Sequence, residues 1–174
     1  MNTLKRLVGV MAFTALGFSG AVAPVSASSE SDAWTTMSCE DRAVSISGAV
    51  EIKIATHAMH DAVHVDLVER VNALKVKLND AGVRAPELKG AMAKLNENRN
   101  HIEATYAAML PAWENLIAMS CADDYDWLVA LNDFQAKEAK FEEAGATAQA
   151  HITNVVLPTI KSLNEKLMLA TMQR

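Results

Sequence analysis

The sequence has little of what interrupts helices or cross-links small folds. Its 174 residues include seven glycines, four prolines and two cysteines, and aromatic residues make up only 5%. Two cysteines are too few for a disulfide-rich scaffold, and scarce glycine and proline leave room for long uninterrupted helices. Alanine and methionine, by contrast, are plentiful. This composition predicts an all-α protein.

Motifs for catalysis and for nucleotide binding are also missing. The sequence contains no glycine-rich phosphate loop, no Gly-x-Ser-x-Gly and no His-Glu-x-x-His. It has no Cys-x-x-Cys-His, which excludes covalently attached c-type haem. The carboxylate–histidine spacing of di-iron bundles is absent as well. We therefore expect a binding protein rather than an enzyme.

Residues 1–27 have the features of a secretory signal peptide. Two basic residues precede an apolar run over residues 7–23, and Pro24-Val25-Ser26-Ala27 matches the small-residue cleavage pattern. The alternative interpretation of this run is an uncleaved membrane anchor. No later stretch is long and apolar enough to span a bilayer. We expect residues 28–174 to form one soluble domain, periplasmic or otherwise secreted.

The charge balance narrows the choice of partners. Cleavage after residue 27 would remove Lys5 and Arg6 but no acidic residue, so the formal net charge of −5 would become −7. An acidic domain of this kind is a poor ligand for nucleic acid or for anionic lipid. We therefore expect no nucleic-acid partner and no attachment to a membrane after cleavage.

Two long helices are predicted in the first two thirds of the domain. Ser38 begins a capping-box pattern, and apolar residues then recur at steps of three and four until about Asn79. Gly82 follows as a helix C-terminus requires. Pro86 suits the first turn of the second helix, and Pro111 should kink this helix. The residues of this helix predicted to face inward are Leu88, Met92, Leu95, Arg99, Ile102, Tyr106, Met109, Trp113 and Leu116.

The third predicted helix begins at Asp123 or Asp124, either of which can cap it. Its periodicity passes through Gly145 without a slip, which favours one long helix, and Pro158 predicts a kink near its end. A break at residues 144–146 would instead give four helices. Short connections imply antiparallel neighbours, so the predicted architecture is an up-down helix bundle with coiled-coil-like packing.

The two cysteines test this layout. A first hairpin that turns near Gly82 places Cys39 and Cys121 at the same open end of the bundle. Two cysteines at matching height in an exported chain predict a disulfide. The alternative is a pair of free, buried thiols.

Three histidines lie on the stripe of the first helix that should face the core. His57, His60 and His64 are spaced by three and four residues, in line with the apolar positions that follow them. In antiparallel helices, residues the same number of positions before and after a turn lie side by side. Counting from the two predicted turns places Tyr106 and Glu138 at about the same height along the bundle as these histidines. We expect these five side chains to converge within about two helical turns.

Such a group suggests two kinds of role. Imidazole with carboxylate is the donor set that zinc and copper prefer, and bundles also hold haem b between facing helices. The candidate ligands are His57, His60, His64, Glu138 and, at the lower edge, His101. Alternatively, the histidines form a structural polar layer or a pH-responsive interface. His151 is far from the others in height and is predicted to lie on the surface.

We expect the structural role to be the correct one. The predicted function is then a non-catalytic binding or interaction module, acting as a homodimer through its third helix or with a periplasmic protein partner. The alternative is a metal- or haem-binding bundle that uses His60 and His64 with Glu138.

Overall fold

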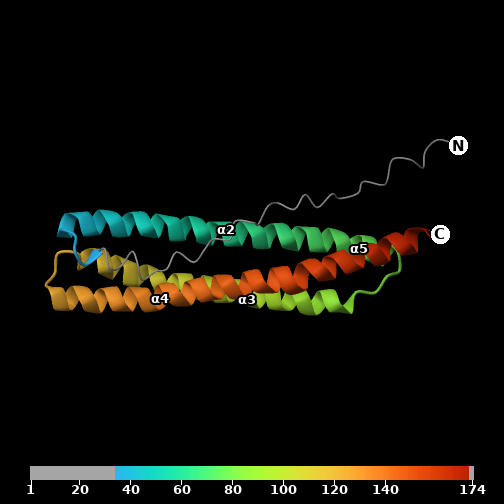
Figure 1. Cartoon of the computed structure of the whole chain (residues 1–174). Helices are drawn as coiled ribbons and strands as arrows, with labels where there is room; N and C mark the ends of the chain where they lie inside the picture. The colour runs from blue at the N-terminus through green and yellow to red at the C-terminus, as the bar shows by residue number, and fades with distance from the viewer. Residues whose placement is uncertain (1–33, 173–174) are drawn as a thin grey trace, which may run out of the picture.

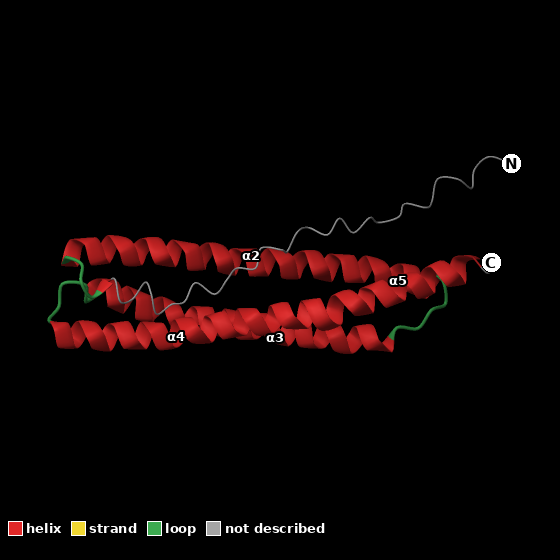
Figure 2. Cartoon of the chain, viewed as in Figure 1, coloured by secondary structure: helices red, strands yellow, loops and turns green. Residues whose placement is uncertain are grey.

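The computed structural model describes residues 34–172, which form three long rods packed side by side (Figure 1). The elements are α2 (Cys39–Asp80), α3 (Pro86–Ala118), α4 (Asp124–His151), the π-helical turn η1 (Ile152–Val156) and α5 (Leu157–Met172). Within the described range there is no strand, and loops join the rods only at their ends (Figure 2). The predicted all-α, up-down bundle is therefore confirmed. The predicted signal peptide lies outside the described residues.

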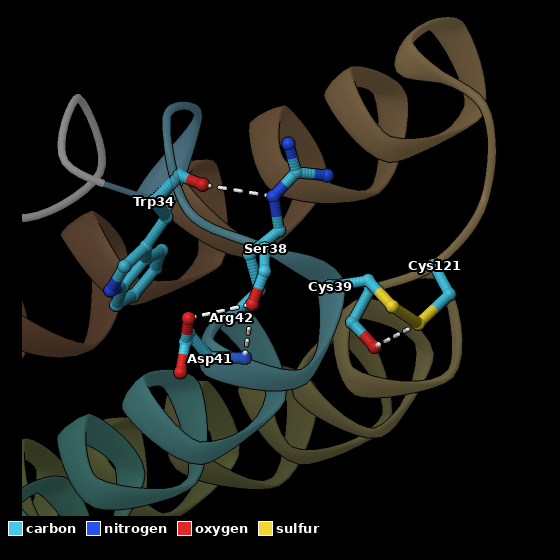
Figure 3. Close-up of a disulfide and its surroundings, with 7 residues drawn as sticks. Trp34, Ser38, Cys39, Asp41, Arg42 and Cys121 are labelled. Atoms are coloured by element: carbon cyan, nitrogen blue, oxygen red, sulfur yellow. Dashed lines mark hydrogen bonds between the residues drawn. A yellow bond between two sulfur atoms is a disulfide. The ribbon is translucent and has the colours of Figure 1, made fainter.

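The predicted helix starts are in place. The Ser38 hydroxyl accepts a hydrogen bond of 3.2 Å from the Asp41 N–H and donates one of 2.6 Å to the Asp41 carboxylate (Figure 3). Asp123 caps α4 by accepting from the backbone N–H groups of Tyr125 and Asp126 at 3.1 and 3.0 Å. Pro86 occupies the first turn of α3, where its missing N–H leaves no hydrogen bond unmade.

The turn between α2 and α3 depends on one glycine. Gly82 has φ 71°, in the left-handed region that other residues adopt at a cost. This conformation lets the Val83 N–H donate to the Leu78 carbonyl at 2.9 Å, and the Gly82 N–H donate to the Asn79 carbonyl at 3.0 Å. These two bonds close a Schellman motif and end α2.

The third rod runs through Gly145 without a break, so three long rods are present and not four. Its irregularity lies at Ile152–Val156, where the Leu157 N–H donates to the Ile152 carbonyl in the wider spacing of a π-helix. Pro158 follows directly and cannot donate to Asn154. Pro111, predicted to kink its helix, lies inside an uninterrupted α3.

None of the helices in residues 34–172 carries an apolar stretch that would reach across a bilayer. Their buried side chains form two apolar clusters, one toward each end of the bundle. The first, at the α3–α4 turn, is rich in aromatic residues and includes Trp34, Trp127, Phe134 and Phe141. The second, near Gly82, is aliphatic: Val71, Leu74, Leu78, Leu88, Ala91, Val156, Ile160 and Leu163.

The predicted disulfide between Cys39 and Cys121 is present and joins the start of α2 to the loop after α3, with Cα atoms 4.7 Å apart (Figure 3). Beside it the Arg42 Nε donates to the Trp34 carbonyl at 2.9 Å, and the guanidinium lies 4.9 Å from the Trp127 ring centroid. The first turn of α2 is therefore fixed both covalently and by packing.

Removal of the disulfide by Cys39→Ser with Cys121→Ser should lower the free energy of unfolding. The cysteines are 82 residues apart, and cross-linking a loop of that size stabilises a fold by roughly 4–5 kcal/mol through the entropy of the unfolded chain. Urea unfolding followed by circular dichroism measures the change. An unchanged urea midpoint would contradict this role for the disulfide.

Candidate functional site

A polar layer lies in the middle of the bundle, beside the inner end of the aromatic-rich cluster. It consists of four α2 side chains at steps of three and four residues, Lys53, His57, His60 and His64, together with the groups that they contact. These residues lie on the same stripe of α2 as the buried Val50 and the later leucines, which turns them toward α3 and α4. Each polar side chain here meets a different neighbour.

Lys53 forms an ion pair with Glu138, the carboxylate that was expected to lie among the histidines. Its Nζ lies 2.9 Å from Glu138 Oε1 and also bonds the Glu142 carboxylate. Burial acts to lower the pKa of Lys53, but its hydrogen bonds to Glu142 and Glu138 and their negative charges raise the pKa above its usual value. Glu138, only 8% exposed, is therefore neutralised by an ammonium group and not by a metal ion or an imidazole.

His57 lies one turn further along α2 and stacks on Tyr106 of α3, with ring centroids 3.9 Å apart and planes 9° from parallel. Its Nε2 is 3.1 Å from a carboxylate oxygen of Glu103, but the direction of approach does not make a hydrogen bond. The predicted proximity of the histidines to Tyr106 is therefore correct for His57. The ring acts here as a flat packing surface.

His60 packs directly against Gly145 of α4. A Cβ atom built on Gly145 would lie 3.0 Å from His60 Nε2 and 3.4 Å from Cε1. Any residue other than glycine would therefore force the imidazole to move. Burial and the nearby His57 lower the pKa of His60 below its ordinary value of 6.5. Gly145 serves the packing of this histidine rather than a helix break.

His64 is 7% exposed and lies beside a cross-helix ion pair. In this pair Arg99 donates to Asp61 Oδ1 from Nη2 at 2.6 Å and from Nε at 2.9 Å. Burial and the Arg99 charge lower the pKa of His64, and the Asp61 charge opposes them in part. A cavity of about 30 Å³ adjoins His60, His64 and Arg99, which is room for a water molecule or two.

Sequence periodicity missed two members of this region. Asn98 is buried in α3, and its Nδ2 lacks a hydrogen-bond partner among the described atoms. Five predicted inward residues of α3 are buried as expected, but at three positions the preceding residue is buried in their place. The buried positions are Ala91, Asn98 and Ala112 rather than Met92, Arg99 and Trp113. The second is His151, predicted to lie on the surface. It is partly buried and donates from Nε2 to the Ala91 carbonyl at 2.9 Å.

The five proposed ligands are not brought together. Glu138 is one turn away from His57 and is bound by Lys53, and His101 is exposed on α3. His60 and His64 keep their spacing of four but face Gly145 and the Arg99–Asp61 pair, respectively. Among residues 34–172 no group of three or more His, Cys, Asp or Glu side chains is placed to hold a metal ion. These side chains instead make separate contacts within the packing of the three rods.

A second feature lies on the opposite side of α2. Small and apolar residues continue along its outward face, which no other described element covers: Val44, Gly48, Ile52, Ala55, Met59 and Ala62. We call this set the outer stripe. Val44 is 74% exposed and Ile52 64% exposed. Because Gly48 has no side chain, the surface there is shallowly indented between Val44, Ser47 and Glu51.

The outer stripe is nearly free of charge. Between Ala43 and His60 the only charged residues are Glu51 and Lys53, and Lys53 faces inward to its two glutamates. An apolar surface that runs along one helix for this distance is typical of a contact with another protein.

Comparisons with family models, with curated proteins and with solved structures give no match for this chain.

Replacement of Gly145 should be coupled to His60. In the wild-type chain Gly145→Ala gains helix propensity, worth about 1 kcal/mol, but displaces the imidazole, so the two effects offset each other. In a His60→Ala background the same change should stabilise by about 1 kcal/mol, because the obstacle is gone. Chemical denaturation of the four proteins measures the coupling energy. Gly90→Ala, at an open helical position, is the control and should stabilise both backgrounds equally.

The stability of the protein should fall as the pH drops below about 6.5. The pKa values of His60 and His64 are lowered in the folded state, so only the unfolded chain takes up their protons just below that pH. The free energy of unfolding should decrease by up to about 1.4 kcal/mol per pH unit for each histidine, and level off once the folded-state pKa values are passed. Thermal unfolding between pH 7.5 and 5.5 measures the slope.

The double variant His60→Gln with His64→Gln should flatten this pH profile. Substitution of the exposed His101 by Gln is the control and should keep the wild-type slope. A profile that is flat in the wild-type protein would contradict the assignment.

Proposed function

We propose that this protein is an exported, non-catalytic interaction module that presents the outer stripe of α2 to a helical partner surface. The single observation that carries the proposal is the uncovered apolar face from Val44 to Ala62. The opposite face of the same helix packs against α3 and α5 and makes side-chain contacts with α4. In a helix of this kind one apolar face packs within the fold, and the other is available to contact a partner.

The rigid attachment of α2 supports this function. The disulfide and the aromatic cluster hold its first turns, and its last turns pack in the aliphatic cluster with Ile160 and Leu163. Between these anchors the polar layer links α2 to its neighbours through the Lys53–Glu138 and Arg99–Asp61 pairs. A face held in this way loses little conformational entropy on binding, which favours affinity.

The polar layer supports the proposal in another way. An imidazole turned outward would leave a gap opposite Gly145, and a lysine turned outward would leave Glu138 buried and unpaired. Rotation of α2 about its axis is therefore costly. The layer fixes which side of the helix faces away from the bundle.

Export is supported by two observations. The first is the signal-peptide pattern of residues 1–27, and the second is the Cys39–Cys121 disulfide, because such bonds persist in oxidising compartments. We place the protein in a bacterial periplasm on this basis.

Site-specific photocrosslinking in the exported chain tests this function. A photoreactive phenylalanine analogue at Ile52 should give a discrete adduct on irradiation of cells, because the side chain would lie in the contact. The same analogue at Val129, 54% exposed on α4, is the matched control and should give none. Equal labelling from both positions, or none from Ile52, would contradict the proposal.

A further inference from the structure

The outer stripe has a seven-residue repeat of small residues. Gly48, Ala55 and Ala62 are seven apart, and Ile52 and Met59 alternate with them, also seven apart. Steps of four and three in this order form a coiled-coil seam in which one of the two positions is always small. A small residue every second turn lets another helix approach closely.

This pattern complements itself when two copies run antiparallel. Two α2 helices related by a two-fold axis near residues 53 and 54 place Met59 of each copy at the height of Gly48 of the other. Ile52 of each copy then lies at the height of Ala55 of the other. Every large side chain meets a small one, and Met59 enters the shallow indentation at Gly48. A parallel pair would instead set large against large and small against small.

The middle of the seam carries no like-charge contact in this arrangement. In the antiparallel register Glu51 of each copy lies at the height of Thr56 of the other, and no like charges lie at the same height between Ala43 and Ala62. Beyond the seam Asp41 of each copy lies at the height of Asp66 of the other, and Asp66 is paired with Arg70 of its own helix. The alternation of large and small side chains is therefore what favours the antiparallel direction.

Other exposed apolar residues in the described part of the chain do not offer such a surface. Leu128 and Val129 lie near the start of α4, and Met168, Leu169 and Met172 lie at the end of α5. Each group covers only one or two helical turns. The outer stripe runs for about 20 residues, or roughly 30 Å along the helix axis.

We propose that the partner of the outer stripe is a second copy of this chain, bound antiparallel about a two-fold axis near residues 53 and 54. This inference rests on the proposed function, since it names the partner of the same surface. Isologous pairing of one patch with itself is the usual route to homodimers. One helix face per copy is small for a specific interface, so the dimer should be reversible, with a Kd on the order of 10–100 µM.

Sedimentation equilibrium of the mature protein tests association. The weight-average mass should rise toward twice the monomer mass as the concentration passes through the Kd. Ile52→Arg should reduce association at least tenfold, because the two introduced charges would lie close to each other across the axis. Val129→Arg is the matched control and should associate as the wild type does. Circular dichroism confirms that each variant is folded.

Paired cysteines test the direction. The double variant Gly48→Cys with Met59→Cys should form a covalent dimer on oxidation, because each new thiol would meet the other type in the partner copy. Either single variant should remain a monomer, since identical positions would lie roughly 16 Å apart along the axis. Covalent dimers from the Gly48→Cys variant alone would overturn the antiparallel register.

The two proposals fail in different ways. A wild-type protein that stays monomeric at millimolar concentration, with an Ile52 photoadduct to a different protein, would overturn the dimer and leave the interaction module standing. Association that Ile52→Arg does not change would overturn the assignment of the dimer to the outer stripe. A monomer with no Ile52 photoadduct would overturn both.

Discussion

The rotation of α2 about its own axis is the constraint on which the rest of the structure depends. One stripe of this helix faces the other rods along its whole length. It is buried toward both ends and partly buried in the middle, where it carries lysine and imidazole rather than aliphatic side chains. Three contacts offset the cost of burying these polar groups. Lys53 pairs with its glutamates, His57 stacks on Tyr106, and His60 fills the space that Gly145 leaves open. Because these contacts are specific in a way that a leucine seam is not, they define a single orientation of the helix, and this decides which residues remain uncovered.

Most of the fold is readable from the sequence because its signals are local. The Ser38 cap, the Schellman glycine at Gly82 and the proline at the start of α3 each act within a few residues, and the three-and-four spacing marks the buried faces of α2 and α4 directly. The inward face of α3 differs from the prediction by one residue at three positions. A stripe through Leu95, Asn98 and Ile102 and one through Leu95, Arg99 and Ile102 have the same period, and only packing against two neighbours decides between them.

The site was harder to predict for a related reason. Residue levels derived from turn positions are accurate to about one helical turn, and that error decides whether Glu138 meets His57 or Lys53. An ammonium group is the stronger partner for a buried carboxylate because it is charged without needing to take up a proton at neutral pH. Gly145 could be read as a possible break or as an ordinary helical residue. Its contact with an imidazole 85 positions earlier in the chain is not encoded in any local pattern.

The π-helical turn at Ile152–Val156 has a consequence for the direction in which the sixteen residues of α5 present their side chains. Ala148, Ile152, Val156 and Ile160 follow one another at steps of four, and an ideal α-helix would carry such a row gradually around its circumference. The wider turn contains one residue more than an α-helical turn and so cancels this drift. The π-helical turn therefore resets the angle at which α5 presents its side chains around the helix axis. Without it, Ile160 and Leu163 would point past α2 instead of packing in the aliphatic cluster.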